Sequence, residues 1–395
     1  MKIYNNALKL LIITPYLFAF SGMLIIPSGD KKMAVFLIIG TLANLLYAKV
    51  NNIDIKNRLL SPYLIIIIIA TIYSIFSYYY HGSSSREMRA LIAISIYLAT
   101  FPLKRLSRRI VIFTLLSSCI LLSISSAYHN LYLGEVRWVG YMNPIPYSTI
   151  CAAIAVMCYS MLLTTSFKIN KYLLSICLIL ASFTIMIGQS RGVWLALLIS
   201  LFVVSITYIK RNPTTKKGIV IFLSVIALAS SCGYFIFQKE IKVKIDQTRL
   251  EIKRIESGQK YTSIGLRLQM WEAVPKLIID SMFIGSGDSH RDKLRKLRMN
   301  GEISKSLYEF NPTHYHNQFL DKQVKSGLIG LVLLILILIY PAFEQKKHQP
   351  CDKPLIYGVI SLYFIASLTD VPFNHPQTLI VFLLILYPHC TEQTS

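Results

Sequence analysis

The sequence predicts an all-α membrane protein that crosses the bilayer about twelve times. Of its 395 residues, 54% are hydrophobic and only 15% are charged, and the mean hydropathy is +0.53. Soluble domains carry about 25% charged residues. The apolar residues also form runs of roughly the 20 residues that a helix needs to cross the hydrocarbon core. Composition and run length together exclude a soluble domain.

Twelve apolar runs of span length follow one another along the chain. They lie at 7–27, 33–49, 59–80, 88–103, 110–127, 147–166, 172–188, 193–209, 218–237, 327–343, 355–371 and 378–390. We therefore assign transmembrane helices 1–9 to residues 1–237, a large polar loop with short helices to residues 238–326, and transmembrane helices 10–12 to residues 327–395. The first run has no small-residue cleavage site, which predicts that it stays as a helix. Because the last run is short and the break at 188–193 is tight, one span more or fewer also fits.

The distribution of cations predicts the orientation. The N-terminus and one set of loops carry eighteen Lys and Arg residues, whereas the opposite short loops carry six. Cytoplasmic loops are enriched in Lys and Arg, so we expect cytoplasmic termini and an outward-facing loop at 238–326. This distribution also explains the net charge of +22 without a nucleic-acid ligand.

The cysteines give no sign of a disulfide framework or a zinc site. All seven lie in apolar runs or in the short segment after Phe343, none lies in the long polar loop, and no paired spacing is typical of zinc ligands.

The polar loop contains two segments with helical character. Residues 263–280 place Ile264, Leu268 and Trp271 at helical spacing, which predicts a helix along the membrane surface or over the bundle. Residues 291–298 are strongly basic, which is typical of a solvated face, or alternatively of contact with anionic lipid headgroups.

Three arginines stand out on the outer side. Arg191 lies in the hinge Gly188-Gln189-Ser190-Arg191-Gly192, where a guanidinium group is costly unless it is paired or functional. A snorkelling side chain or a structural ion pair is the plainer interpretation. By itself Arg267 is one surface charge among many, and Arg137 has Glu135 as a nearby partner in sequence.

The segment 311–330 carries two histidines directly before an apolar run. A metal site at His314 and His316 needs a third ligand; His290 and Glu309 are candidates without a supporting spacing, and the chain has no HExxH pattern. If Asn311 or Thr313 caps the following helix, His316 lies in its first turn, where the helix dipole favours a neutral ring. A neutral imidazole suits a general base. The alternative is a buried structural histidine.

Missing motifs narrow the chemistry further. We find no Asp-x-Asp pair, no phosphate-binding glycine loop and no Ser/His/Asp order. Outward arginines with a neutral histidine suit a phosphorylated substrate whose anionic leaving group is bound by guanidinium groups rather than by a metal. A lipid-linked activated substrate is a natural candidate.

Over essentially its whole length the chain resembles the bacterial O-antigen ligases, within the group of ligases and polymerases that act on undecaprenyl-diphosphate-linked glycans. The resemblance rests on the span pattern, the large late loop and five short motifs. These are Gln189-Ser190-Arg191-Gly192, Gly265-x-Arg267 with Trp271, Gly285-x-Gly287, His314-x-His316-Asn317, and Gly327 with Gly330.

The resemblance implies a GT-C type membrane glycosyltransferase in the bacterial inner membrane, working at the periplasmic face without metal or cofactor. It implies inverting transfer of an O-antigen glycan from undecaprenyl diphosphate to lipid A-core. Arg191 and Arg267 would bind the diphosphate, and His316 would accept the proton of the acceptor hydroxyl.

Further positions follow from the same resemblance. Arg137, Gln189, His314 and Asn317 would contact the substrates, although relatives do not require a histidine at the position of His314. Asp370 matches an acidic position, for which we expect only a helix-packing or arginine-pairing role.

Three other functions fit parts of the pattern. An O-antigen polymerase shares the lipid-linked donor. A transporter of lipid-linked glycans also carries intramembrane arginines, but the two halves of this chain show no repeated broken helices. A purely structural membrane anchor leaves the placement of Arg191 and His316 unexplained.

Overall fold

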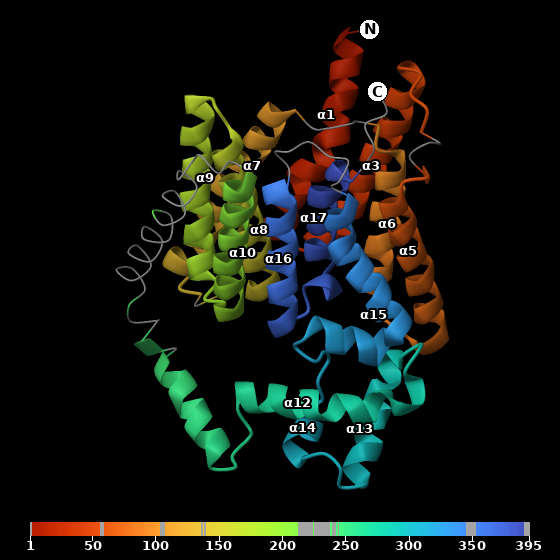
Figure 1. Cartoon of the computed structure of the whole chain (residues 1–395), viewed down its shortest axis with the longest axis vertical. Coiled ribbons are helices and arrows are strands. Elements are labelled where there is room, and N and C mark those ends of the chain that lie inside the picture. The colour runs from red at the N-terminus through yellow and green to blue at the C-terminus, as the bar shows by residue number, and fades with distance from the viewer. Residues whose placement is uncertain are drawn as a thin grey trace.

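The computed structural model describes residues 2–55, 59–102, 107–135, 137, 140–211, 224, 238, 242–243, 245–344 and 353–390. Every element assigned within these ranges is a helix, as the sequence predicted. The helices form a bundle that carries both termini at one end and a cap of short helices at the other (Figure 1).

The first part of the bundle contains α1 (Lys2–Ala19), α2 (Gly22–Ile25), α3 (Gly29–Val50), α5 (Pro62–His81), α6 (Ser85–Thr100), α7 (Arg108–Ala127), η1 (Tyr128–Tyr132), α8 (Pro144–Thr164), α9 (Lys168–Ile187) and α10 (Arg191–Arg211). The cap contains α12 (Ser263–Ile278), η2 (Ile279–Ser281), η3 (Gly287–Ser289), α13 (His290–Met299) and α14 (Lys305–Phe310). The chain returns to the bundle with α15 (Gln318–Glu344), α16 (Lys353–Thr369), η6 (Pro372–Asn374), α17 (Pro376–Leu386) and η7 (Tyr387–His389).

Among the described residues, eight helices are long and apolar enough to cross a membrane, and α16 and the α17–η7 segment are shorter apolar helices. This confirms a polytopic membrane protein. The predicted run at 88–103 corresponds to α6, which has 16 residues, and the run at 378–390 to α17, which has 11. The run at 218–237 lies outside the described residues apart from Ser224.

Helix α8 is the centre of the bundle. Almost its whole circumference is buried, and it packs against α9, α10, α16 and α17. Small residues, among them Ala152, Ala153 and Ala155, are fully buried along it. Such residues allow neighbouring helices to approach closely, which is how helices associate where lipid competes for apolar surface.

The cap has an apolar core of its own. Helix α12 lies across the end of the bundle (Figure 1), which confirms the helix predicted at 263–280. It buries Leu266, Met270 and Leu277, whereas Leu268, one of the residues whose spacing predicted the helix, is 38% exposed. These side chains join others of α13, α14 and the start of α15 in a second apolar cluster.

The basic helix α13 projects on the side of the cap away from the bundle (Figure 1). Leu294 anchors it in the apolar cluster of the cap, while Arg291, Arg295 and Lys296 are exposed. This placement favours the interpretation of its cations as a solvated face.

Helix α15 is broken at Gly327, which joins the cap to the bundle. Gly327 has φ 63° and ψ −168°, a conformation essentially restricted to glycine. The break lets the amides of Leu328 and Ile329 donate hydrogen bonds to the carbonyls of Met282 and Phe283, at 2.8 and 3.1 Å. From α5, the Tyr73 hydroxyl donates to the Ser326 carbonyl at 2.6 Å and so holds the break in place.

We predict that Gly327→Ala strongly destabilises the protein. A Cβ atom at this position would lie 2.3 Å from the Phe283 carbonyl carbon, and the backbone conformation itself is worth about 1–3 kcal/mol of strain for any other residue. Gly301→Ala is the matched control, because Gly301 also has positive φ but no heavy atom within 4 Å of the added Cβ. Thermal unfolding of the purified proteins in detergent should show the larger drop for Gly327→Ala; equal drops would contradict the close-approach argument.

Candidate active site

The histidine segment 313–317 lies directly before α15 and is fixed by the cap of that helix. The Asn317 side-chain oxygen accepts hydrogen bonds from the amides of Phe319 and Leu320, at 3.1 and 3.2 Å. Asn317 is therefore the N-cap, and the expectation that Asn311 or Thr313 caps the helix is wrong. His316 precedes the helix in a left-handed conformation with φ 47°, so the helix-dipole argument for its first turn does not apply.

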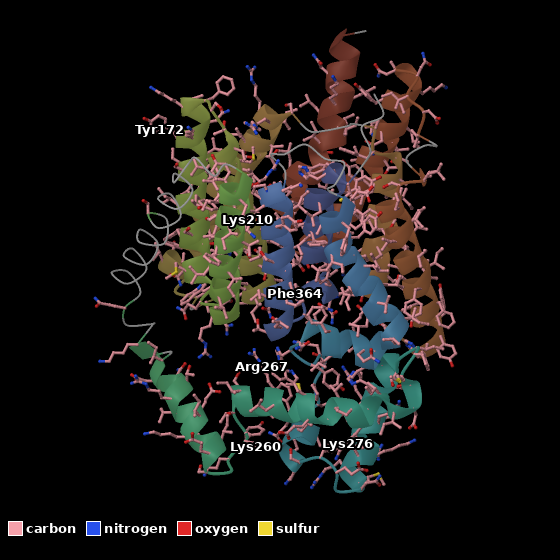
Figure 2. All side chains as sticks on the ribbon, viewed as in Figure 1. Tyr172, Lys210, Lys260, Arg267, Lys276 and Phe364 are labelled. Carbon is pink, nitrogen blue, oxygen red and sulfur yellow. The ribbon has the colours of Figure 1, made fainter. Side chains whose placement is uncertain are left out.

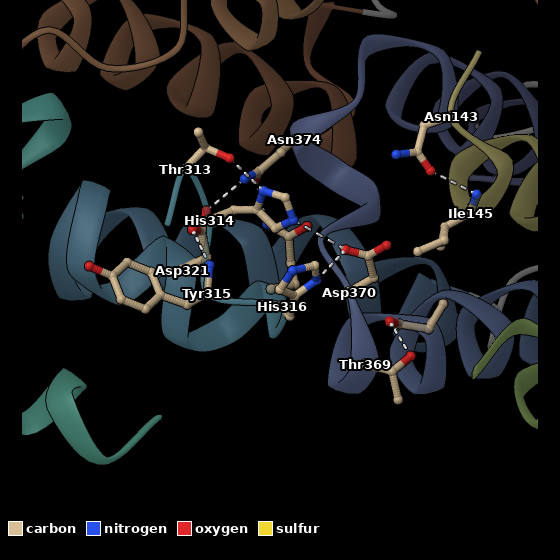
Figure 3. Close-up of polar contacts among 12 residues, drawn as sticks. Asn143, Ile145, Thr313, His314, Tyr315, His316, Asp321, Thr369, Asp370 and Asn374 are labelled. Atoms are coloured by element: carbon tan, nitrogen blue, oxygen red, sulfur yellow. Dashed lines mark hydrogen bonds and ion pairs between the residues drawn. The ribbon is translucent and has the colours of Figure 1, made fainter. Parts of the chain in front are cut away.

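Asp370 is the residue that both histidines face (Figure 3). Its Oδ1 lies 3.5 Å from Nδ1 of His316 and 3.7 Å from Nε2 of His314, and the two imidazole centres are 4.3 Å apart. Asp370 follows the end of α16, and its side chain is 9% exposed. The left-handed turn at His316 thus brings two rings against one buried carboxylate.

The two histidines differ in their remaining contacts. His314 also approaches the Thr313 hydroxyl with Nδ1, at 3.1 Å, so both of its ring nitrogens face polar partners. Burial and the neighbouring His316 lower the pKa of His314 to about 4, so this ring is neutral at neutral pH. His316 directs only Nδ1 at Asp370.

The Asp370 carboxyl is ionised at neutral pH. Burial alone would raise its pKa, but the facing imidazoles of His316 and His314 hold that pKa below its usual value. The carboxylate is positioned by close helix packing: a Cβ atom on Gly192, at the start of α10, would lie 2.4 Å from the Thr369 hydroxyl oxygen. Glycine at this point therefore brings the hinge of Arg191 against the end of α16.

A second carboxylate, that of Asp321 in the first turn of α15, holds the histidine segment in place. It is 1% exposed, accepts a hydrogen bond from the Tyr315 amide at 3.1 Å and another from the Asn374 side-chain amide at 2.6 Å, and pairs with Lys325 at 3.0 Å. Trp271 of α12 donates to the Tyr315 carbonyl at 2.9 Å. The backbone amide and carbonyl of Tyr315, the residue between the two histidines, are therefore both hydrogen-bonded to side chains of other segments.

The three arginines singled out in the sequence lie in one electrostatic neighbourhood. Arg267 lies between α12 and the bundle (Figure 2), and burial lowers the pKa of its guanidinium group. Asp370 opposes this pKa shift, whereas the nearby charges of Arg191 and Arg137 add to it. The charges of Asp370, Arg191 and Arg137, from distant parts of the chain, therefore lie close enough to Arg267 to affect its pKa.

Arg191 and Arg137 have few protein partners for their charge. Arg191 is exposed and donates to the Thr248 hydroxyl. Nε of Arg137 is buried without a hydrogen-bond partner in the described part of the chain. Glu135, its expected partner, instead lies 2.9 Å from Nδ1 of His129. A buried guanidinium nitrogen without a partner is costly, and an anionic ligand would satisfy it.

Gln189 lies in the same hinge, two residues before Arg191. It has φ 45° and its amide donates to the Met186 carbonyl at 3.1 Å, which turns the chain from α9 into α10. This turn is why the guanidinium group of Arg191 emerges at the cap end of the bundle.

The other proposed histidine and glutamate ligands lie elsewhere. His290 is buried and hydrogen-bonds the Tyr315 hydroxyl through Nδ1 at 3.0 Å, and burial lowers its pKa to about 4. Glu309 is exposed and pairs with Lys305 at 3.5 Å. The third potential ligand is instead Asp370: one donor atom from each of His314, His316 and Asp370 falls within 4.8 Å of the others. Two imidazoles and a carboxylate are a donor set that zinc also accepts.

Sequence reasoning underestimated Asp370 and did not find Asp321. Asp370 is separated from the histidines by more than fifty residues, and Asp321 resembles any acidic residue in the first turn of a helix. The available signal was an acidic residue within or beside an apolar run, where an ionised group is rarely without a partner.

Part of the chain that contributes to this site is similar to a known family. Residues 176–335 match the family model for O-antigen ligase, a range that includes Arg191, Arg267 and both histidines but neither Arg137 nor Asp370. The matched segment and the relatives below make this chain similar to proteins of the O-antigen ligase/polymerase superfamily.

Three relatives illustrate the similarity. An uncharacterized protein of Haemophilus influenzae is 25% identical over 69% of this chain and 70% of its own length. The O-antigen ligase of Escherichia coli K12 is 25% identical over 60% of this chain, and the match spans 57% of that ligase. The exopolysaccharide production protein ExoQ of Rhizobium meliloti is 32% identical over 76 residues, 18% of either chain.

We predict that Asp321→Ala loosens the histidine segment. The substitution removes the acceptor of the Tyr315 amide and of the Asn374 amide and the carboxylate partner of Lys325, and a broken buried pair costs about 3–5 kcal/mol. Amide hydrogen exchange at residues 313–317 should accelerate. Asp321→Asn, which retains an oxygen for the Tyr315 amide, should have a smaller effect. Removing the exposed Glu309 is the control, and equal protection in all three variants would show that Asp321 is not the anchor.

Proposed function

We propose that the protein is an O-antigen ligase that transfers a glycan from undecaprenyl diphosphate to lipid A-core. The match of residues 176–335 to the O-antigen ligase family model and the similarity to a ligase from Escherichia coli support this class of reaction. The observation that carries the proposal is the placement of Arg137, Arg191 and Asp370 near Arg267, with the Asp370 carboxylate also facing His316.

The arginine cluster supports a diphosphate leaving group. Guanidinium groups bind phosphate oxygens through paired hydrogen bonds and keep their charge in a partly buried site. Arg267 is partly buried, and Arg137 has a buried nitrogen without a partner among the described residues. Their combined positive charge would stabilise the negative charge that develops on the diphosphate as it leaves.

His316 is the proposed base. The oxygen of the acceptor hydroxyl attacks the anomeric carbon, its proton passes to Nε2 of His316, and the bond from that carbon to the diphosphate oxygen breaks. Attack opposite the leaving group inverts the anomeric centre. Asp370 lies 3.5 Å from the other ring nitrogen, Nδ1, where a carboxylate orients the ring and stabilises the imidazolium that forms.

The remaining predicted contacts are assigned to substrate positioning. His314 shares Asp370 with His316 but has both ring nitrogens near protein atoms, so we assign it a supporting role. Gln189 shares the hinge of Arg191, and the Asn317 oxygen caps α15, so each would act chiefly by placing the neighbouring charged or basic side chain.

Membrane orientation and the absence of a metal requirement are parts of the same proposal. The excess of cations at the termini and their loops supports cytoplasmic termini in the bacterial inner membrane, with the cap and the site at the periplasmic face. Guanidinium groups supply the charge stabilisation that a divalent metal supplies in other transferases, so we expect no metal or cofactor to be required.

We predict that His316→Ala and Arg191→Ala each lower glycan transfer by about 100-fold or more, since each removes a group acting on the transition state. Purified protein with lipid-linked donor and lipid A-core, without ATP, provides the measurement. Lys276→Ala, in the cap but paired with Glu302, is the control and should retain activity. Normal transfer by either of the first two variants would contradict the assignment.

We also expect the protein to retain its transfer activity in excess chelator. A loss of activity that zinc restores would instead assign the histidines and Asp370 to a metal site.

A different variant tests the positioning role of Asp370. Asp370→Asn keeps the size of the side chain but removes the charge opposite the imidazole, so transfer should fall by at least about 10-fold while donor binding changes little. If Asp370 served only packing, Asp370→Asn would transfer glycan at the wild-type rate.

The alternative function is an O-antigen polymerase, which would use the same lipid-linked donor. Deletion of the gene separates the two. Loss of a ligase leaves full-length polymer on the lipid carrier, whereas loss of a polymerase leaves core with at most one repeat unit. A lipid-linked glycan transporter would show no transfer by purified protein at all.

A further inference from the structure

A large apolar cavity lies at the end of the bundle opposite the candidate active site. It has a volume of about 290 Å³, is partly open, and is lined by residues of α1, α7, α8, α16, α17 and η7. Phe20, Leu115, Met157 and Leu384 give it a predominantly apolar wall. Its volume corresponds to about twenty water-sized spheres, and apolar cavities hold water poorly. An apolar ligand fits this space better.

One polar group inside the wall has no partner. Tyr16 of α1 lines the cavity and is 5% exposed, and its hydroxyl has no hydrogen-bond partner in the described structure. A buried hydroxyl without a partner is destabilising. A ligand with an oxygen acceptor, such as an ester or phosphate group, would satisfy it.

The cavity also has a cationic rim. Arg108, the first residue of α7, lines it and is exposed, and no carboxylate of the described chain pairs with it. Arg109 follows it on the same helix turn but does not line the cavity. Basic pockets between transmembrane helices commonly bind anionic lipid headgroups.

We propose that this cavity is a binding site for an anionic phospholipid, one acyl chain filling the apolar space and its phosphate pairing with Arg108. The Tyr16 hydroxyl donates to an oxygen of the ester or phosphate. The positive charge of Arg108 favours an anionic headgroup over a zwitterionic one. The proposed ligand is therefore a two-chain anionic phospholipid from the surrounding leaflet. The site is separate from the transferase chemistry of the cap, so it stands whatever the fate of that assignment.

Native mass spectrometry and thermal unfolding of the full-length protein in detergent test this proposal. The probes are phosphatidylglycerol, phosphatidylethanolamine and undecaprenyl phosphate, added separately. Phosphatidylglycerol should be retained and should raise the unfolding temperature, because a ligand that binds the native state stabilises it. Arg108→Ala should reduce its retention by about 10-fold, corresponding to the loss of one charge-assisted contact. Arg109→Ala is the matched control and should bind as the wild type does.

The Tyr16→Phe variant distinguishes lipid binding by the Tyr16 hydroxyl from a purely structural role of this side chain. Without lipid, the variant should be at least as stable as the wild type, since it removes an unsatisfied hydroxyl. With phosphatidylglycerol, its gain in unfolding temperature should be smaller than that of the wild type. Equal retention of phosphatidylethanolamine, preferential retention of undecaprenyl phosphate, or an unchanged lipid response in both Arg108→Ala and Tyr16→Phe would each overturn the proposal.

Discussion

The buried Asp321 carboxylate is the interaction on which the polar half of the protein depends. It connects three segments: the histidine segment through the Tyr315 amide, the α16–α17 connection through Asn374, and its own helix through Lys325. A carboxylate with this little exposure is tolerable only when its oxygens are fully engaged. Since Asn374 lies four residues after Asp370, the same group that fixes the histidines also fixes the connection carrying their carboxylate partner.

Close approaches of glycine backbone then set the distances between these segments. The break at Gly327 lets the cap pair with α15 through backbone hydrogen bonds to Met282 and Phe283. Gly192 brings the start of α10 against Thr369. Both contacts need a residue without a Cβ atom. These two glycines, which are far apart in the sequence, therefore set how the arginine hinge, the cap and the histidine segment lie relative to one another.

The sequence was sufficient for the class of fold and for the kinds of residue in the site, and insufficient for their partners. Run lengths predicted the helices because a span needs a fixed length of apolar chain. The predicted N-cap of α15 was wrong because Asn311, Thr313 and Asn317 are all favourable N-cap residues. Only the tertiary contacts of Tyr315 determine which of them begins the helix. The spacing of Ile264, Leu268 and Trp271 predicted the helix α12 but not the face that it buries, because periodicity alone does not say which side meets the bundle.

Charge balance explains why the arginines matter more together than singly. The neighbouring ion pairs, Asp321 with Lys325 and Glu87 with Lys322, are internally neutral. The arginine cluster is not neutral: Arg267 lies near the negative charges of Asp370 and, more weakly, Glu251, and near the positive charges of Arg191 and Arg137. Three positive charges against two negative charges leave a net positive region even when both carboxylates are ionised. The two carboxylates therefore offset only part of the repulsion among the guanidinium groups, and an anionic ligand that enters gains energy by neutralising the remainder.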